Sequence, residues 1–263
     1  TIRLREFGYS REDLELLVGP MAERGEEPVG SMGTDVPLAI LCERPRLLYD
    51  YVHQLFAQVT NPPIDAIREE LVTGMSIYLG AQGNLFEEEE SAARQVRIDE
   101  PLLDTEDMNR LRALQAPGLA AEVLSTRWDP RSGGEGLDAA LAALGAAAER
   151  AIAEHGRTIL ILSDRGSSAV TAPIPMLLAL GAVHHHLIRR GLRTRCGIVV
   201  ESGEPREVHH FAALFGYGAG AIHPYLALEL VDWLVEHGRI PGPPAEARRR
   251  YLHAAAKGVL KTM

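Results

Sequence analysis

Two glycine-containing turns in the second half of the chain hold the residues best placed to do chemistry. The first turn carries Ser202 and Gly203, and the second carries Gly218 and Gly220. Backbone N–H groups at such turns can bind a phosphate, because glycine permits close approach and the end of a helix favours an anion. These four residues are therefore the candidate anion-binding residues of the sequence.

The residues beside these turns argue against a bound phosphate. Glu201 and Glu204 flank the first turn, and His223-Pro224 follows the second. The pattern resembles the last two strand–helix units of flavin-binding TIM barrels, whose corresponding turns hold the FMN phosphate. Those barrels usually have a double glycine at the first turn and Gly-Arg or similar after the second strand. Because carboxylates repel a phosphate, we expect tight turns without a cofactor. A regulatory barrel that binds a small molecule or anion is the alternative.

Ten histidines raise the possibility of a metal site. They include the runs His184-His185-His186 and His209-His210, but neighbouring residues on a helix point about a third of a turn apart and do not converge on one ion. His185 falls on an apolar stripe with Leu177 and Ile188, which predicts a hydrogen-bonded core histidine. The sequence has no HExxH motif and no cysteine–histidine cluster, so we expect no metal.

Ser163-Asp164-Arg165-Gly166 follows a predicted buried strand, a position at which catalytic residues often lie. A serine nucleophile needs a paired base, and the spacing of the sequence identifies none. GxSxG, P-loop and strand-following GxGxxG motifs are absent from the sequence. We therefore expect no catalytic residues in this chain.

Strands and helices alternate regularly from residue 118 to residue 240. The sequence predicts strands at 119–124, 158–162, 196–200 and 221–222, and helices at 137–152, 173–190, 206–215 and 226–236. This spacing is that of βα units, which form a parallel sheet or barrel. In such folds a site lies at the carboxyl ends of the strands, here the loops 163–172, 201–205 and 223–225.

The remaining segments are less regular, and the whole of residues 1–263 is expected to form one domain. In the irregular half, residues 1–117, Ser10 and Asp13 form a capping-box pattern, and a helix is predicted from Glu43 to Gln58 because apolar residues recur at helical spacing. Residues 241–263 are a linker and a C-terminal helix. The expected fold class is α/β, a degenerate TIM-barrel-like (β/α) domain related to FMN-binding barrels, with extra N-terminal helices.

Composition restricts the function further. The 263-residue chain has a formal net charge of −9, so it would repel nucleic acids and anionic membranes. Its first residues lack the apolar stretch of a signal peptide, and no apolar run is long enough to span a bilayer. Cys42 and Cys196 form no CxxC pair and are expected to be reduced. We expect a cytoplasmic protein.

Several longer stretches resemble the central domain of the glutamate synthase large subunit. They are residues 27–39, 44–51, 54–65, 83–85, 163–166, 182–187 and 208–212. The block from Gln54 to Asp65 (QLFAQVTNPPID) is highly specific. The resemblance extends from about Ser10 to Met263, which is nearly the whole chain.

The resemblance implies a parent enzyme that converts L-glutamine and 2-oxoglutarate to two L-glutamates with electrons from NADPH or ferredoxin. An amidotransferase domain with an N-terminal cysteine would release ammonia, which travels through an internal tunnel to a domain that binds FMN and an iron–sulfur cluster. The implied partners are these two domains of the same polypeptide, with a small NADPH-oxidising subunit as a further possibility. Residue 1 is threonine, and the iron–sulfur cysteine cluster is absent from the sequence. The chain is therefore expected to be an excised, non-catalytic domain that connects the two active sites and helps to form the tunnel.

Overall fold

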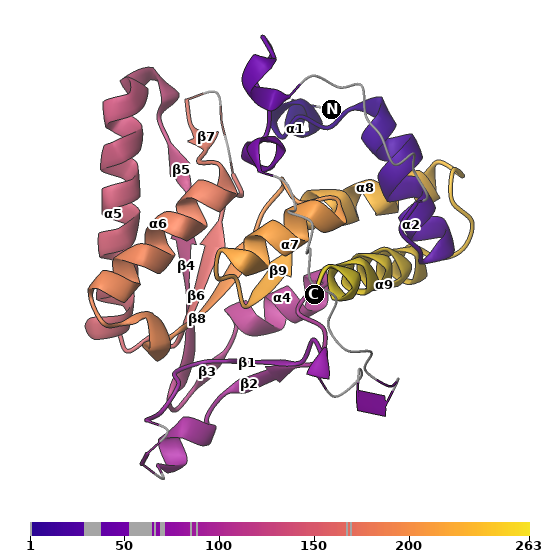
Figure 1. The fold of residues 1–263 in the computed structure, drawn as a ribbon. Coiled ribbons are helices and arrows are strands. Elements are labelled where there is room, and N and C mark those ends of the chain that lie inside the picture. The colour runs from indigo at the N-terminus through magenta and orange to yellow at the C-terminus, as the bar shows by residue number, and fades with distance from the viewer. Residues whose placement is uncertain are drawn as a thin grey trace.

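The computed structural model describes residues 2–28, 38–52, 65, 67–68, 72–84, 86–87, 89–166, 168 and 170–263. The main sheet has five strands in the order β3-β4-β6-β8-β9 (Figure 1). Its strands are β3 (Gln115–Ala116), β4 (Leu119–Ser125), β6 (Ile159–Ser163), β8 (Gly197–Glu201) and β9 (Ala221–His223). Strand β3 is antiparallel to β4, and the other four strands are parallel to one another.

The register of the parallel strands aligns their carboxyl ends. Ser125 pairs with Ser163, Ser163 pairs with Glu201, and Glu201 pairs with His223. Every residue of β6 is buried, which explains the unbroken apolar run of the sequence from Ile159 to Leu162. The last residue of each parallel strand therefore lies at one common edge of the sheet.

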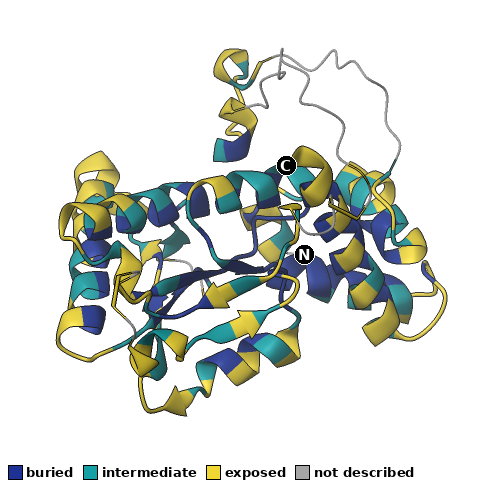
Figure 2. Cartoon of the chain, turned by 60° about the horizontal axis from the view of Figure 1, so that its bottom comes forward, coloured by how far each residue is buried: buried dark blue, intermediate teal, exposed yellow. Residues whose placement is uncertain are grey.

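Helices cover one face of the sheet. Helices α5 (Gly133–Ala153), α6 (Met176–Arg189) and α7 (Val208–Gly216) connect successive strands, and α8 (Tyr225–Glu236) follows the last strand. Leu162 and Val200 belong to the same hydrophobic core as buried residues of these helices. Figure 2 shows dark blue, buried strands in the middle of the protein, with exposed residues on the outer sides of the helices.

The other face of the sheet is covered by helix α4 (Thr105–Arg112) and a two-stranded antiparallel hairpin, β1 (Ile77–Leu79) and β2 (Val96–Ile98). Ile161 and Val199 form a separate core cluster with Met108 of α4 and Leu79 of β1. Gly220 lets the hairpin approach closely, because a Cβ atom at that position would lie 2.6 Å from the Leu79 Cδ2 atom and would displace that side chain.

The two ends of the chain pack together beside this sheet. Helix α2 (Gly19–Arg24) and the preceding π-helical segment Asp13–Val18 share a core with the C-terminal helix α9 (Pro244–Thr262), and Figure 1 shows α2 beside α9. The predicted capping box is present: the Ser10 N–H donates to Asp13 Oδ2 at 2.8 Å, and the Asp13 N–H donates to Ser10 Oγ at 3.1 Å. The N-terminal segment is therefore anchored to the main core.

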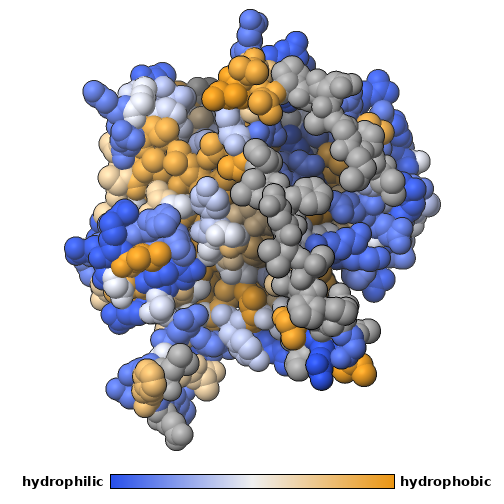
Figure 3. Space-filling model, viewed as in Figure 1, coloured by the Kyte–Doolittle hydropathy of each residue, from blue (hydrophilic) through white to orange (hydrophobic). Residues whose placement is uncertain are grey.

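The remaining elements are short. They are helix α1 (Ile2–Glu6), the antiparallel pair β5 (Arg127–Trp128) and β7 (Ala172–Pro173), and 3₁₀ turns at Ala39–Leu41, Leu48–Tyr51, Glu90–Ala93, Pro130–Ser132 and Arg193–Arg195. On the face seen in Figure 3, hydrophobic residues gather over α6, whereas the part over α2 is hydrophilic. No helix in the described residues is long and apolar enough to cross a membrane.

The α/β class predicted from the sequence is confirmed, and each strand and helix predicted between residues 118 and 240 is present. The four parallel strands follow one another in sequence order, as they do in a barrel. In the described residues the sheet ends at β3 and β9, and the outer side of β9 pairs with the chain only at an isolated parallel bridge between Ile222 and Leu102, so its relation to a barrel stays a prediction.

The helix predicted from Glu43 to Gln58 is wrong over the part that the structure describes. Only Leu48–Tyr51 is helical, as a 3₁₀ turn, and residues 53–58 lie outside the described residues. The turn buries Tyr49 completely and leaves Tyr51 49% exposed. The helical spacing predicts that Tyr51 is buried, but the core takes up the Tyr49 side chain instead. This tertiary contact overrides the local pattern.

Candidate functional site

The residues at the carboxyl edge of the sheet point alternately to its two sides. Ser163 and Glu201 come two positions after Ile161 and Val199, which contact the α4 side, so their side chains also face α4. By the same alternation, the residues that follow these strands face the helix layer; they are Thr126, Asp164 and Ser202. Both rows are buried, and they form two polar clusters.

The first cluster, called the Glu201 cluster, consists of Glu201, Ser163, Arg112 and Arg165. Glu201 is fully buried and accepts hydrogen bonds from Arg165 Nε at 2.8 Å, from Ser163 Oγ at 2.5 Å and from Arg112. Burial alone would raise the pKa of Glu201, but its hydrogen bonds with Ser163 and Arg165 and the charge of Arg112 hold it below the ordinary value. The cluster is a compensated ionic network at the end of β8.

His223 completes this side of the edge. Its Nδ1 atom lies 2.9 Å from the Leu103 carbonyl oxygen, so Nδ1 carries the donated proton. Burial lowers the pKa of His223, which favours the neutral imidazole. The Leu103 N–H in turn donates to the Ile222 carbonyl at 2.8 Å, so the segment that leads into α4 is tied to β9.

The second cluster, called the Asp164–Glu204 cluster, lies on the helix-layer side and consists of Asp164, Ser202, Glu204, Thr126, Tyr9 and Tyr49. Asp164 Oδ2 accepts from Ser202 Oγ at 2.6 Å, and the Gly203 N–H lies 3.2 Å from both Asp164 oxygens. Glu204 Oε2 accepts from the Met176 N–H at 3.1 Å. Among the described residues, neither carboxyl group has an ion-pair partner within 4 Å.

The surroundings of these two carboxyl groups raise their pKa values to near neutral pH. Burial raises the pKa of Asp164 to about 7. Burial and the nearby charge of Asp164 raise the pKa of Glu204 to about 7 as well. Such a rise is what burial produces when no cation contacts a carboxyl group, because the charged form loses its hydration without gaining a counter-ion.

Arg206 is the closest candidate counter-ion, but its guanidinium is used elsewhere. It donates to the carbonyl oxygens of Phe7 and Gly8, both at 3.0 Å, and lies 3.3 Å from Asp13 Oδ2. It also stacks over the ring of Tyr9 at 4.3 Å. Arg206 therefore anchors the N-terminal segment and acts on the two carboxyl groups only at longer range.

Three buried hydroxyl groups have no hydrogen-bond partner among the described residues: those of Tyr9, Tyr49 and Thr126. The Tyr49 ring stacks on His210 with a centroid distance of 4.4 Å, and its hydroxyl approaches the Glu204 carboxyl without completing a hydrogen bond within normal limits of distance and angle. Burial raises the pKa of both tyrosines. Unpartnered buried hydroxyls are rare in folded proteins and call for an explanation.

The structure does not bring the four candidate anion-binding residues together. Ser202 and Gly203 follow β8 at the carboxyl edge, whereas Gly218 and Gly220 precede β9 at the opposite edge of the sheet. The donors of the first turn are already used by the Asp164 carboxyl. A Cβ atom at Gly203 would lie 2.6 Å from the Phe7 ring, so this turn leaves no room for an FMN phosphate beside it. Whether either turn binds another anion stays a prediction.

The histidine runs do not converge on one point. The prediction that His185 is a core residue is wrong: it is exposed, because the buried stripe of α6 runs through Leu180, Val183 and Leu187 instead. His186 Nε2 lies 2.9 Å from Glu149, and His209 Nε2 lies 3.1 Å from the Tyr49 carbonyl oxygen. The described residues contain no group of three or more histidine, cysteine, aspartate or glutamate side chains that could hold a metal ion.

Sequence reasoning missed most of the residues in these clusters. It interpreted Glu201 and Glu204 as charges that would repel a phosphate, whereas both are buried inside the protein. It did not single out Asp164 as a cluster residue, and it placed Tyr49 in a longer helix. Extending the inward–outward alternation of each strand by two residues would have predicted which side chains share a face.

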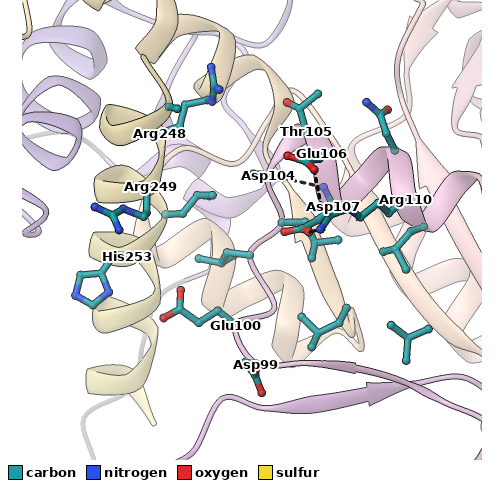
Figure 4. Close-up of a pocket in the computed structure, with 18 of the residues that line it drawn as sticks. Asp99, Glu100, Asp104, Thr105, Glu106, Asp107, Arg110, Arg248, Arg249 and His253 are labelled. Carbon is teal, nitrogen blue, oxygen red and sulfur yellow. Dashed lines mark hydrogen bonds and ion pairs between the residues drawn. The ribbon is translucent and has the colours of Figure 1, made fainter. Parts of the chain in front are cut away.

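A surface groove lies apart from these clusters, between α9 and the segment formed by β2 and α4. It has a volume of about 1280 Å³. Figure 4 shows acidic side chains around the start of α4 on one wall and basic side chains of α9 on the other. Many of these charges are paired locally: Asp104 caps α4 by accepting from the Asp107 N–H at 2.8 Å, and Arg248 pairs with Asp232 at 2.5 Å. The groove therefore lacks a concentrated charge of one sign.

Fold and site together define an α/β domain of consecutive strand–helix units whose carboxyl edge is filled by its own polar side chains. Comparison with known proteins identifies its family. The glutamate synthase central domain family matches residues 2–263, and the chain belongs to that family.

The similar proteins are much longer than this chain. The NADPH glutamate synthase large chain of Bacillus subtilis is 44% identical over 261 residues, which are 99% of this chain and 17% of that protein. The ferredoxin-dependent glutamate synthase 2 of Synechocystis is 45% identical over 249 residues, which are 89% of this chain and 16% of that protein. A sulfite-bound flavocytochrome b2 is similar to 62% of this chain and 33% of its own, with 15% identity and a TM-score of 0.34, which is too low to support an argument about the fold.

Proposed function

We propose that this chain is the non-catalytic central domain of a glutamate synthase. In this proposal it connects the glutamine amidotransferase domain to the FMN and iron–sulfur domain of the same polypeptide, and it contributes wall to the tunnel through which ammonia passes. The parent reaction converts L-glutamine, 2-oxoglutarate and a reductant to two L-glutamates, in the cytoplasm. Family membership over residues 2–263 is the observation that carries the proposal.

The arrangement of the carboxyl edge supports a non-catalytic role. In α/β folds with parallel strands, catalytic groups at this edge are presented to a cleft. Here Asp164, Glu201 and Ser202 are fully buried and are bonded chiefly to other groups of the protein. Such groups fix the relative positions of the strands, the N-terminal segment and α4, which is what a connecting domain requires.

The order of the strands supports descent from a barrel that has lost its flavin. Strands β4, β6, β8 and β9 are parallel and lie in sequence order, as consecutive strands of a (β/α)8 barrel do. Helix α4 and the hairpin β1–β2 cover the face that would line the interior of a closed barrel. The residues of the β8 turn do not fit FMN, because the Asp164 carboxyl takes the turn's N–H donor and Phe7 fills the adjacent space. In this proposal FMN and the iron–sulfur cluster belong to a neighbouring domain.

A tunnel wall needs shape and continuity more than reactive groups. Ammonia that escaped into solvent would be protonated and would no longer act as a nucleophile. A rigid domain between the two active sites prevents this loss by holding them in a fixed relation. The ionic network around Glu201 joins strand β8 to α4 and to the end of β6, and it gives the domain such rigidity.

The proposal is tested in a complete synthase that contains this chain between its flanking domains. The enzyme is given glutamine labelled with ¹⁵N in the amide group, together with an excess of unlabelled ammonium. We expect the glutamate made from 2-oxoglutarate to carry the label almost undiluted, so that about half of the total glutamate contains ¹⁵N by mass spectrometry, because the other half derives from glutamine and keeps its unlabelled α-amino group. The purified chain alone is expected to show neither glutaminase nor glutamate-forming activity, and measurable turnover of either reaction would refute the non-catalytic assignment.

A variant of the domain tests its part in retaining ammonia. Glu201→Gln weakens the network at the carboxyl edge and should dilute the label, while glutaminase activity and ammonia-dependent glutamate synthesis persist when they are measured separately. Glu135→Gln, an exposed residue of α5, is the matched control and should leave the label undiluted. Equal retention of label by both variants would count against a structural role of this edge in channelling.

A further inference from the structure

The Asp164–Glu204 cluster has an excess of negative charge in a buried place. Asp164 and Glu204 are 0% and 5% exposed, and Ser202 links them, because its Oγ donates to Asp164 at 2.6 Å and accepts from the Glu204 N–H at 3.1 Å. Among the described residues no arginine, lysine or histidine contacts either carboxyl group. By contrast, Glu201 on the other side of the sheet contacts two arginines.

The charge cannot be balanced by rearranging the nearest arginine. The Arg206 guanidinium is held by the carbonyl oxygens of Phe7 and Gly8 and by Asp13, all of which belong to the N-terminal segment. Turning it toward Glu204 would leave the buried Phe7 carbonyl oxygen without this donor, which is costly, and would also break its bonds to Gly8 and Asp13. The other groups around the cluster, Tyr9, Tyr49, Tyr225 and His210, carry no permanent positive charge.

The same place contains oxygen atoms that lack partners. The hydroxyl groups of Tyr49 and Thr126 belong to residues that are 0% exposed, and that of Tyr9 is buried as well; none forms a hydrogen bond with a described residue. Thr126 lies in the same row as Asp164 on the helix-layer side, and the Tyr49 hydroxyl approaches Glu204. Carboxylate and hydroxyl oxygens from five separate segments of the chain therefore lie in this part of the core.

We propose that the Asp164–Glu204 cluster is an internal site for one monovalent cation of the size of ammonium or potassium. Such an ion places one positive charge between the two carboxyl groups and halves their combined charge, and it gives the unpartnered hydroxyl oxygens a partner. Ammonium donates four hydrogen bonds in a tetrahedral arrangement, and potassium coordinates oxygen atoms. A water molecule would satisfy the hydroxyl groups without neutralising the carboxylates, and a proton on one carboxyl would neutralise charge without giving the hydroxyls a partner.

The test measures the thermal unfolding midpoint of the purified protein at pH 8, where both carboxyl groups tend to be charged. Ammonium, potassium, sodium or tetramethylammonium chloride is added at constant ionic strength. We expect ammonium or potassium to raise the midpoint saturably, by roughly 2 to 6 °C between 1 and 100 mM, because a ligand that binds only the folded state stabilises it. Tetramethylammonium is too large to enter and should have no such effect. The ion that raises the midpoint at the lower concentration is the one that the site prefers.

Variants connect the effect to the cluster. Glu204→Gln and Asp164→Asn should abolish the saturable rise, whereas the exposed control Glu135→Gln should preserve it. If these changes prevent folding, Thr126→Val and Tyr49→Phe provide a milder test, since each removes one hydroxyl at nearly constant volume. Each is expected to raise the cation concentration at half-saturation several-fold.

Three results would overturn the proposal: an equal rise with tetramethylammonium, a saturable rise that persists in Glu204→Gln, or a stability that depends on pH but on none of the cations. The last result would mean that a proton alone balances the charge. The inference does not rest on the proposed function, since cation binding is measured on this chain alone and channelling on a complete synthase. Either can fail without the other.

Discussion

Replacing Asp164 with asparagine should remove much of the pH dependence of folding stability between about pH 4 and pH 7. Burial raises the pKa of Asp164 from its ordinary 3.8 to about 7, so in that range the folded state binds a proton that the unfolded state releases. Stability therefore falls as pH rises through this window, and the contribution of the bound proton is fully present only below the ordinary pKa. Asparagine cannot titrate and has no such dependence.

The magnitude follows from the two pKa values. A difference between 3.8 and about 7 corresponds to roughly 4 kcal/mol of unfolding free energy lost between pH 4 and pH 8. The observed loss should be smaller, about 2 to 4 kcal/mol, because Glu204 titrates in the same range and the two groups influence each other. Asp164 is almost fully buried, so solvent screening reduces the effect little.

The assay is urea unfolding at pH 5, 6, 7 and 8 with tetramethylammonium as the only buffer cation, so that no smaller cation contributes. At each pH, the unfolding free energy of Asp164→Asn is subtracted from that of the unmodified protein. The informative quantity is how this difference changes with pH. Its absolute value also contains the altered hydrogen bonds to Ser202 and Gly203. If the two proteins lose stability in parallel over this range, Asp164 does not hold a proton in the folded state and the electrostatic reasoning is refuted.

Three further predictions concern packing, the ionic network and cofactor binding. In urea unfolding, Gly220→Ala should lower the unfolding free energy by about 1 to 3 kcal/mol, because the new Cβ atom would lie 2.6 Å from Leu79 Cδ2. The control Gly216→Ala places its new atom in open space and should change the unfolding free energy by less than about 1 kcal/mol. Glu201→Gln should lower the unfolding free energy by about 2 to 4 kcal/mol in the same assay, because Arg112 and Arg165 lose their buried counter-ion. Equilibrium dialysis of the purified chain against FMN, phosphate and 2-oxoglutarate should show no saturable binding, because the donors of the β8 turn are occupied.

Each of these predictions has a result that contradicts it. Equal stability of the Gly220 and Gly216 variants would mean that the β1–β2 hairpin yields easily to the added atom. A Glu201→Gln protein as stable as the original would mean that the network adds little beyond the cost of burying its charges. Saturable FMN or phosphate binding would restore the anion-site hypothesis for one of the two turns, and substitution of Gly203 or Gly218 would identify which.

Much of the fold could be predicted because its signals are local. The apolar run from Ile159 to Leu162 predicts a strand buried on both faces, and β6 occupies residues 159–163. The capping box at Ser10 and Asp13 forms as its residue types require. Regular alternation of strands and helices from residue 118 to residue 240 predicts a parallel sheet, which the structure contains.

The errors arose where a distant contact overrode the local pattern. Tyr49 enters the core from a single 3₁₀ turn because it stacks on His210, which the spacing of its neighbours cannot reveal. His185 lies outside the buried stripe of α6, since that stripe is set by which face meets the sheet. The four anion-site candidates lie apart because one turn follows strand β8 and the other precedes strand β9, so the turns are at opposite edges of the sheet. The glycines themselves do not indicate this separation.

The sequence by itself determined the α/β class, the order of the strand–helix units and the resemblance to the glutamate synthase central domain, because periodicity and residue motifs are properties of short segments. Only the tertiary structure decided that the glycine turn at Ser202-Gly203 encloses the Asp164 carboxyl, and that Glu204 is buried beside Tyr49 without a counter-ion. Burial, charge compensation and pKa depend on groups that meet from distant parts of the chain. No local pattern of residues specifies those meetings.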